Sequence, residues 1–264
     1  TIMSVNNSPY CAAILKYGTE DQKRRFLVPV ASGKAHGAFL LTEPHAGSDA
    51  SAIKARARRE GNQWRLSGSK QFITSGSIAD YAMIFAVTDP EAGKRGISCF
   101  LAPTKTAGYT VAAIEKKLGQ RTSDTCQILL EDLLLPPEQV LGAEGEGYKI
   151  ALANLESGRI GIAAQAVGMA RAAFEAAVEY AKQRESFGTV IINHQAVAFR
   201  LADMATELAA AEQLGLHAAR LKDAGEPCLK EASMAKLFAS EMAERVCSAA
   251  IQTHGGYGYL NDFP

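Results

Sequence analysis

The chain has 264 residues, 47% of them hydrophobic and 21% charged, which is the composition of a globular protein with a sizeable buried core. Its 28 basic and 28 acidic residues cancel, so no overall field favours nucleic acid or an anionic membrane as a partner. No apolar run reaches the roughly 18 residues of a membrane-spanning helix, and we expect no membrane insertion.

The five cysteines are far apart and include no Cys-x-x-Cys pair: Cys11, Cys99, Cys126, Cys228 and Cys247. None lies at a zinc-site spacing from a histidine, so we predict free thiols, no metal site and a reducing compartment. We expect no signal or transit peptide at the start. Neither end has the polar character of a natural terminus, so we expect the chain to be part of a longer polypeptide.

Residues 1–34 have a helical pattern. Thr19 followed by Gln22 is a capping box, which predicts the start of a helix with Phe26, Leu27 and Val30 on one face. Because helices of this size cannot bury their apolar faces alone, we interpret 1–34 as the end of an N-terminal helical domain.

Residues 35–142 change to a pattern of strands separated by turns. The predicted strands are Ala38–Leu41, Gln63–Ser67, Phe72–Thr74, Tyr81–Thr88, Gly96–Ala102, Tyr109–Ile114 and Gln127–Leu130. Short strands at these intervals predict an antiparallel barrel or sandwich, which forms a middle β domain. We interpret the basic clusters Lys23–Arg25 and Arg56–Arg59 as solvated faces.

Residues 143–264 are rich in alanine and helical in pattern. Three long helices are predicted at Tyr148–Arg184, Gln195–Asp223 and Leu229 to about Thr253. Three such helices with short connections are typical of a four-helix bundle that lacks one member. The predicted fold class is therefore α+β multidomain: an N-terminal helical part, a central antiparallel β domain and an incomplete C-terminal helical bundle.

Four segments stand out from this framework. Leu41–Asp49 is a loop of small and polar residues after a strand, which is either a simple turn or a loop whose amides approach an anionic ligand. Gln71–Gly76 has the pattern of a strand, Arg184–Gly188 that of a helix end, and Gln252–Tyr259 carries three glycines in four positions. Each has an ordinary structural interpretation by itself, whereas their combination and order indicate a shared function.

These segments resemble the signatures of the acyl-CoA dehydrogenase family, and the resemblance covers the whole chain. The two most specific stretches are Leu41–Asp49 and Gln252–Tyr259. Gly119–Thr125, Arg184–Gly188 and Glu156–Gln165 are also similar to family motifs. The resemblance implies a short-chain or short-branched-chain enzyme and FAD bound between the β domain and the bundle.

The resemblance also implies which residues hold the cofactor. Those expected to contact FAD are Phe39, Leu40, Leu41, Thr42, Gly47, Ser48, Phe72, Ile73, Thr74, Arg184, Phe187, His194, Gln195, Gln252, Gly255 and Gly256. Thr42 and Thr74 supply hydroxyls to the flavin edge, and Thr74 is suited to donate toward flavin N5. Arg184 is expected to reach the pyrophosphate from a neighbouring subunit, so the resemblance implies a homo-oligomer, typically a dimer of dimers.

The acyl-CoA channel is implied to be lined by Ser48, Glu156, Gly158 and Arg159. Some relatives place their catalytic glutamate at the position of Gly158, but glycine cannot abstract a proton. Most others carry it beyond the Gly255–Tyr259 motif, so we name no catalytic residue here and expect the base beyond Pro264. Two further departures are Phe72, where many relatives carry Trp, and His45, which replaces a small residue and which we interpret as a surface side chain.

The function implied is FAD-dependent α,β-dehydrogenation of a short- to medium-chain or branched acyl-CoA. Removal of the α-proton accompanies hydride transfer to the flavin, and an electron-transferring flavoprotein is the expected electron acceptor. The alternatives are a flavin monooxygenase or nitroalkane-type oxidase on the same fold, and a member that binds a partner without catalysis. The expected location is the cytoplasm in a bacterium or the mitochondrial matrix in a eukaryote.

Overall fold

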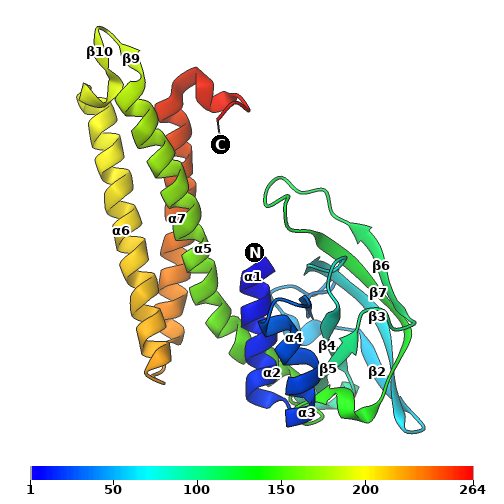
Figure 1. Ribbon diagram of the computed structural model, residues 1–264. Coiled ribbons are helices and arrows are strands. Elements are labelled where there is room, and N and C mark those ends of the chain that lie inside the picture. Colours follow the sequence, from blue (N-terminus) through cyan, green and yellow to red (C-terminus); the bar gives the residue numbers. More distant parts are fainter. Residues whose placement is uncertain (1, 264) are drawn as a thin grey trace. The chain divides into compact units, whose positions relative to one another are not determined.

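The computed structural model describes residues 2–263, and its contacts divide the chain into two compact units, Thr1–Gly158 and Arg159–Pro264. Figure 1 shows the helices and strands that make up each unit. Among the described residues, no helix combines the length and apolar character needed to cross a membrane.

The first unit opens with short helical segments. They are α1 (Ile2–Val5), a wider turn at Asn6–Cys11, α2 (Ala12–Tyr17), α3 (Glu20–Gln22), a second wide turn at Lys23–Leu27 and α4 (Val28–Ala31). The predicted capping box is confirmed: the Gln22 amide donates to the Thr19 hydroxyl at 3.2 Å, and the Thr19 amide donates to the Gln22 side chain at 3.0 Å. Gln22 is buried and also donates to the carbonyls of Glu138 and Val140, which ties this helix to the far end of the sheet.

Replacing Thr19 with alanine should remove one half of this capping box. We expect the free energy of unfolding to fall by about 1 kcal/mol, the usual cost of losing an N-cap hydroxyl. Urea unfolding followed by circular dichroism measures the change. Thr19→Ser keeps the hydroxyl and is the matched control; an equal loss in both variants would contradict the role of the cap.

The middle of the first unit is one mixed sheet. Its strands are β1 (Gly37–Leu40), β2 (Arg56–Glu60), β3 (Gln63–Thr74), β4 (Tyr81–Val87), β5 (Ile97–Pro103), β6 (Tyr109–Ile114), β7 (Thr125–Leu135) and β8 (Val140–Leu141). Single helical turns lie at Ala50–Ala52 and Pro137–Gln139, and Pro90–Gly96 is a helical segment interrupted at Gly93. The hydrogen-bonded order is β6-β7-β3-β2-β4-β5-β8, with β1 added to β4. The predicted antiparallel pairing is found except where β4 runs parallel to β1 and β2.

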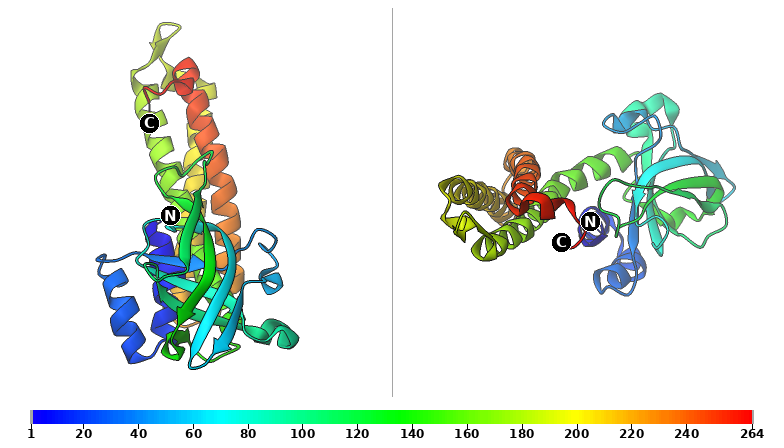
Figure 2. Two further views of the ribbon diagram at one scale, coloured as in Figure 1. Left: turned by 90° about the vertical axis from the view of Figure 1, so that its right-hand side faces the viewer. Right: turned by 90° about the horizontal axis from the view of Figure 1, so that it is seen from above.

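Two hydrophobic cores cover the two faces of this sheet. Met83 and Phe85 of β4 pack with Tyr10, Ile14 and Phe26 of the N-terminal helices. The alternate residues of the same strand point the other way, since successive strand side chains face opposite sides. They pack with Trp64, Leu66, Phe100 and Leu133 inside the curve of the sheet, which Figure 2 shows from two further directions.

The second unit is an antiparallel array of three long helices. They are α5 (Gly147–Gln183, which begins in the first unit), α6 (Gln195–Asp223) and α7 (Leu229–His254). A hairpin of β9 (Glu185–Ser186) and β10 (Thr189–Val190) follows α5, with single helical turns at Ile191–Asn193 and Gly255–Tyr259. The predicted three helices are thus confirmed to within a residue or two. Buried alanines such as Ala170, Ala211 and Ala239 form much of the core and let the helices approach closely.

Candidate functional site

The loop that follows β1 is held by a buried ion pair. Lys70 of β3 is 0% exposed and Glu43 of the loop is 3% exposed, and the Lys70 Nζ lies 2.8 Å from Glu43 Oε1. The same ammonium donates to the carbonyl of Leu41 at 3.1 Å. Glu43 also accepts from the amides of Lys54 at 2.6 Å and Ala55 at 3.0 Å, so it joins three segments of chain. Burial lowers the pKa of Lys70 to about 8, although Glu43 acts in the opposite direction.

Beside this ion pair, β3 carries a bulge that presents Phe72. The pairing of β3 with β7 shifts register between Lys70 and Ile73, and the Gln71 amide donates instead to the carbonyl of Thr42 at 2.9 Å. Phe72 has φ of 56° and is 63% exposed, which is a strained backbone and an unusual exposure for an aromatic residue. The structure therefore brings the Thr42 loop and the Phe72 segment together, as the sequence led us to expect of neighbouring site residues.

The other predicted residues of these two segments differ in exposure, and therefore in how they can contact a ligand. Thr42 and Thr74 are half-buried, whereas Gly47 and Ser48 are exposed. Leu40, Leu41 and Ile73 are buried in the two cores, so they can contact a ligand only through their backbone. Phe39 is half-buried and packs on Phe85 with ring centroids 4.9 Å apart. His45 is exposed, as predicted for a surface side chain, with Nε2 3.2 Å from the carbonyl of Ala52.

The segment Gly119–Thr125 lies against the end of β3. Asp124 accepts from the amide and the hydroxyl of Ser77, each at 2.8 Å, and its own carbonyl accepts from the Ser75 amide. Burial alone would raise the pKa of Asp124, but the hydrogen bonds that its carboxylate accepts, from Ser77 and Cys126 among others, together lower the pKa. Lys117 donates to the carbonyls of Gln120 and Ser123, which closes the loop on itself. This family-like segment thus fixes the chain just beyond Thr74.

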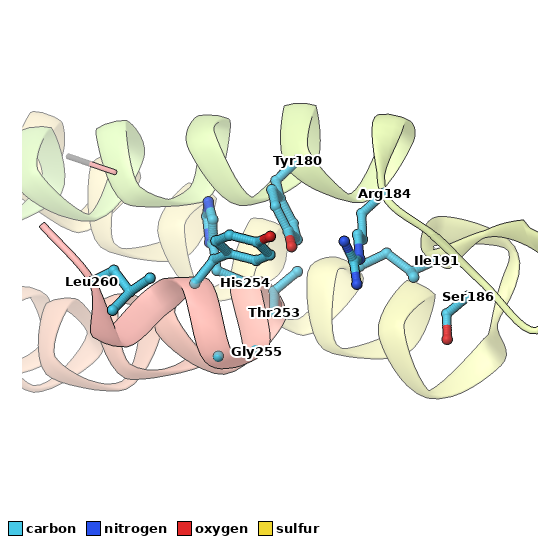
Figure 3. A pocket seen from close by; sticks show the side chains of 10 residues that line it. Tyr180, Arg184, Ser186, Ile191, Thr253, His254, Gly255 and Leu260 are labelled. Atoms are coloured by element: carbon cyan, nitrogen blue, oxygen red, sulfur yellow. The ribbon is translucent and has the colours of Figure 1, made fainter. Parts of the chain in front are cut away.

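In the second unit, Arg184 lies in a cavity of about 590 Å³ at one end of the helices (Figure 3). The cavity is lined by Tyr180, Arg184, Ser186, Ile191, Thr253, His254, Gly255, Gly256, Tyr257 and Leu260. The Arg184 guanidinium lies 5.6 Å from the centre of the Tyr257 ring, and Tyr180 stacks on His254 at 4.5 Å. A guanidinium beside glycine backbone suits an anionic group such as a phosphate.

The hairpin next to Arg184 presents a second exposed aromatic residue. Phe187 and Gly188 form its two-residue turn with φ of 54° and 79°, and the Phe187 side chain is 97% exposed. His194 supports the hairpin, because its Nε2 lies 3.1 Å from the carbonyl of Ser186 and its ring meets Phe187 edge to face at 6.1 Å. A strained and exposed aromatic residue at the tip of a turn suggests contact with something outside this chain.

The remaining predicted residues lie elsewhere. Gln252 faces a separate depression lined by Arg200, Glu244, Arg245, Ser248 and Ala249, and does not line the Arg184 cavity. Gln195 is the first residue of α6. Glu156, Gly158 and Arg159 lie on α5 where the two units join along the chain, and a side chain added at Gly158 would meet no atom within 4 Å.

Sequence reasoning missed Lys70, Tyr180 and the role of Glu43. Glu43 belonged to a recognised motif, but its buried partner lies 27 residues away in a polar stretch of β3. No group of three or more His, Cys, Asp or Glu side chains in residues 2–263 is arranged to hold a metal ion.

Comparison with known proteins identifies the family of the chain. Models of the N-terminal, middle and C-terminal domains of acyl-CoA dehydrogenases match residues 1–34, 38–133 and 145–264. The butyryl-CoA dehydrogenase of Megasphaera elsdenii superposes with a TM-score of 0.96 at 43% identity, over 99% of this chain and 69% of that one. The chain belongs to the acyl-CoA dehydrogenase family.

Two other members of the acyl-CoA dehydrogenase family are similar to the chain over its whole length or nearly so. The mitochondrial short-chain specific acyl-CoA dehydrogenase of Bos taurus is 47% identical over all of this chain and 64% of its own length. A glutaryl-CoA dehydrogenase from Mycobacterium smegmatis, solved in complex with FADH2, has a TM-score of 0.92 and 36% identity, over 99% of this chain and 66% of that one. The chain therefore spans about two thirds of the length of these relatives.

Proposed function

We propose that the protein to which this chain belongs binds FAD and dehydrogenates a short acyl-CoA thioester between Cα and Cβ. The observation that supports this most is the Phe72 bulge, where an exposed aromatic ring on a strained backbone lies beside the Thr42 loop. An isoalloxazine ring needs a flat apolar partner and polar groups at its edge, and this corner of the first unit offers both.

The residues present fit such a cofactor. Phe72 would stack on the ring, and the hydroxyls of Thr42 and Thr74 would bond its polar edge, with the Thr74 hydroxyl as donor. Arg184 would pair with the pyrophosphate, and Phe187 would cover the cofactor of a neighbouring subunit. When bound, FAD supplies the hydride acceptor that no amino-acid side chain can provide. The relative solved with FADH2 supports the choice of cofactor.

The chain's own residues bind and orient the thioester. Ser48, Glu156 and Arg159 are proposed to line its path, and Gly158 leaves open space at this point of α5. A carboxylate must remove the α-proton, and hydrogen-bond donors must stabilise the charge that develops on the thioester oxygen. We assign neither role to a residue of this chain; the base stays a prediction for a residue beyond Pro264.

The two relatives named for short-chain and butyryl substrates support a short acyl chain. We propose an electron-transferring flavoprotein as the electron acceptor and a homo-oligomer, typically a dimer of dimers, as the assembly. The mitochondrial matrix is the proposed location in a eukaryote, as the bovine relative's name indicates for that protein, and the cytoplasm in a bacterium.

Anaerobic titration of the full-length protein tests this proposal. The purified protein should show the flavin spectrum, and butyryl-CoA should bleach it within seconds under anaerobic conditions. Thioesters with eight carbons or a branched chain, tested beside butyryl-CoA, report the preferred length. Absence of flavin would contradict the cofactor, and bleaching by nitroalkanes but by no acyl-CoA would indicate an oxidase.

The electron acceptor is tested separately by reoxidation. The reduced protein is mixed either with air-saturated buffer or with an electron-transferring flavoprotein under anaerobic conditions. We expect fast reoxidation by the flavoprotein and slow reoxidation by oxygen. The reverse order would favour the monooxygenase or oxidase interpretation.

A further inference from the structure

The Glu43–Lys70 pair is a costly way to hold a loop. Both side chains are almost fully buried in the first unit, and removing two charges from water costs several kcal/mol per ion. Their mutual attraction repays this only in part, and apolar side chains of similar size often stabilise a fold equally well. What a buried ion pair supplies beyond stability is a defined geometry among the segments that it joins.

The joined segments are the two that flank the proposed flavin position. Glu43 fixes the loop from Leu41 to Asp49 against the start of β2 through the amides of Lys54 and Ala55. Lys70, which lies two residues before Phe72 on β3, fixes the same loop to that strand by donating to the carbonyl of Leu41. The pair therefore sets the distance between the loop and the bulge without reaching either exposed surface.

The bulge depends on this arrangement. Lys70 is the last residue of β3 paired with β7 before the register shifts, and pairing resumes at Ile73. Between them the Gln71 amide turns to the carbonyl of Thr42, which lies within the loop that Glu43 holds. A non-glycine residue with positive φ, such as Phe72, persists only where its surroundings determine it. Here the amide of the preceding residue, Gln71, is held by the Thr42 carbonyl, and Lys70 holds the neighbouring Leu41 carbonyl.

We propose that Glu43 and Lys70 are positioning residues that fix the Thr42 loop and the Phe72 bulge in one geometry before a flavin binds. This inference rests on the proposed function for its consequence, namely that the pair controls flavin affinity and spectrum without touching the flavin. Neither residue is a catalytic residue. The conformational part concerns only this chain and is measured without a cofactor.

The first test uses hydrogen exchange on the flavin-free protein. The variant K70M/E43Q removes both charges and keeps similar volumes, so the fold should survive. We expect faster exchange in peptides covering residues 41–56 and 70–76 and unchanged exchange in β4 and β5. E60Q, which breaks an exposed ion pair with Arg65 on β2 and β3, is the matched control and should leave both peptides unchanged. Equal exchange in K70M/E43Q and the wild type would overturn the proposal.

The second test measures FAD binding and the flavin absorption spectrum of the full-length protein. In K70M/E43Q we expect affinity to fall by about ten- to a hundredfold, as for other groups that orient a binding residue from behind, together with a shifted absorption band. E43D, which keeps the charge but withdraws the carboxylate by one methylene, should fall between that variant and the wild type. If K70M/E43Q does not fold, the FAD affinity and the absorption spectrum of E43D decide the test.

The two proposals fail in different ways. If the wild-type protein binds no FAD, the proposed function is contradicted, and hydrogen exchange alone decides whether the pair fixes the two segments. If the wild type binds FAD and the variants bind it with the same affinity and spectrum, the positioning role is contradicted and the proposed function stands.

Discussion

Replacing Arg184 with glutamate should leave the full-length protein almost free of FAD. The guanidinium lies in a cavity beside glycine backbone, 5.6 Å from the centre of the Tyr257 ring. Loss of a charge-assisted hydrogen bond to a phosphate, together with a new repulsive charge, should weaken FAD binding by about a hundredfold or more. Equilibrium dialysis with FAD measures the change. R171Q, which breaks the exposed ion pair between Arg171 on α5 and Glu212 on α6, is the control and should bind normally.

The same variant tests whether a site is shared between subunits. F72D places a carboxylate where the flavin ring should stack and should also lose FAD, but through the first unit. If Arg184 serves the cofactor of a neighbouring subunit, co-expression of R184E and F72D should restore about a quarter of the flavin sites in randomly mixed dimers. No restoration would mean that both residues act on the same copy of the cofactor, or that Arg184 has no such role.

The long helices could be predicted closely from the sequence. Gln195–Asp223 and Leu229–His254 are bounded by clear signals, since Gly225 and Pro227 break the pattern between them and Gly255 ends the second. The period of their apolar residues also persists over many turns, which makes the assignment robust. Helix bounds depend on local residue types, and local residue types are what a single sequence displays.

Several strands were missed or shortened, for a different reason, and β2 and β3 are the clearest cases. The basic cluster Arg56–Arg59 was interpreted as a solvated face, and its arginines are exposed, but the strand that carries them, β2, was missed; Ala57 is the one buried residue of that strand. The polar stretch from Ser67 to Gln71 hid the continuity of β3, which runs for 12 residues through a bulge. Pairing with β3 and β4 decides the formation of β2, and pairing with β7 decides the bulge of β3. Pairing between strands leaves little local signal.

Part of the candidate site could likewise be predicted from the sequence, and part could not. The Thr42 loop and the Phe72 segment were found through their motifs, and the structure brings them together through the bond from the Gln71 amide to the Thr42 carbonyl. Lys70 was not found, because a lysine in a polar stretch is ordinarily exposed. Only the folded chain places it opposite Glu43, and only there does its charge become a constraint on the loop.

Replacing Lys70 alone with methionine should destabilise the first unit more than replacing both members of the pair. The single variant leaves the Glu43 carboxylate buried without Lys70, with the amides of Lys54 and Ala55 as hydrogen-bond donors and His45 Nε2 at 3.5 Å. Breaking a buried pair in this way typically costs about 3–5 kcal/mol, whereas exchanging both charges for neutral side chains costs much less.

Urea unfolding of K70M and of K70M/E43Q, both without flavin, measures this difference directly. R65M on the same strand removes one partner of exposed ion pairs and should cost far less stability than K70M. If K70M lost no more stability than R65M, the carboxylate of Glu43 would have found water or another partner. The geometry of the Thr42 loop would then depend on its backbone contacts and not on the ion pair. If K70M lost much stability and the added E43Q restored most of it, the two charges would act as one unit. That unit joins the Thr42 loop to the strand that carries the Phe72 bulge.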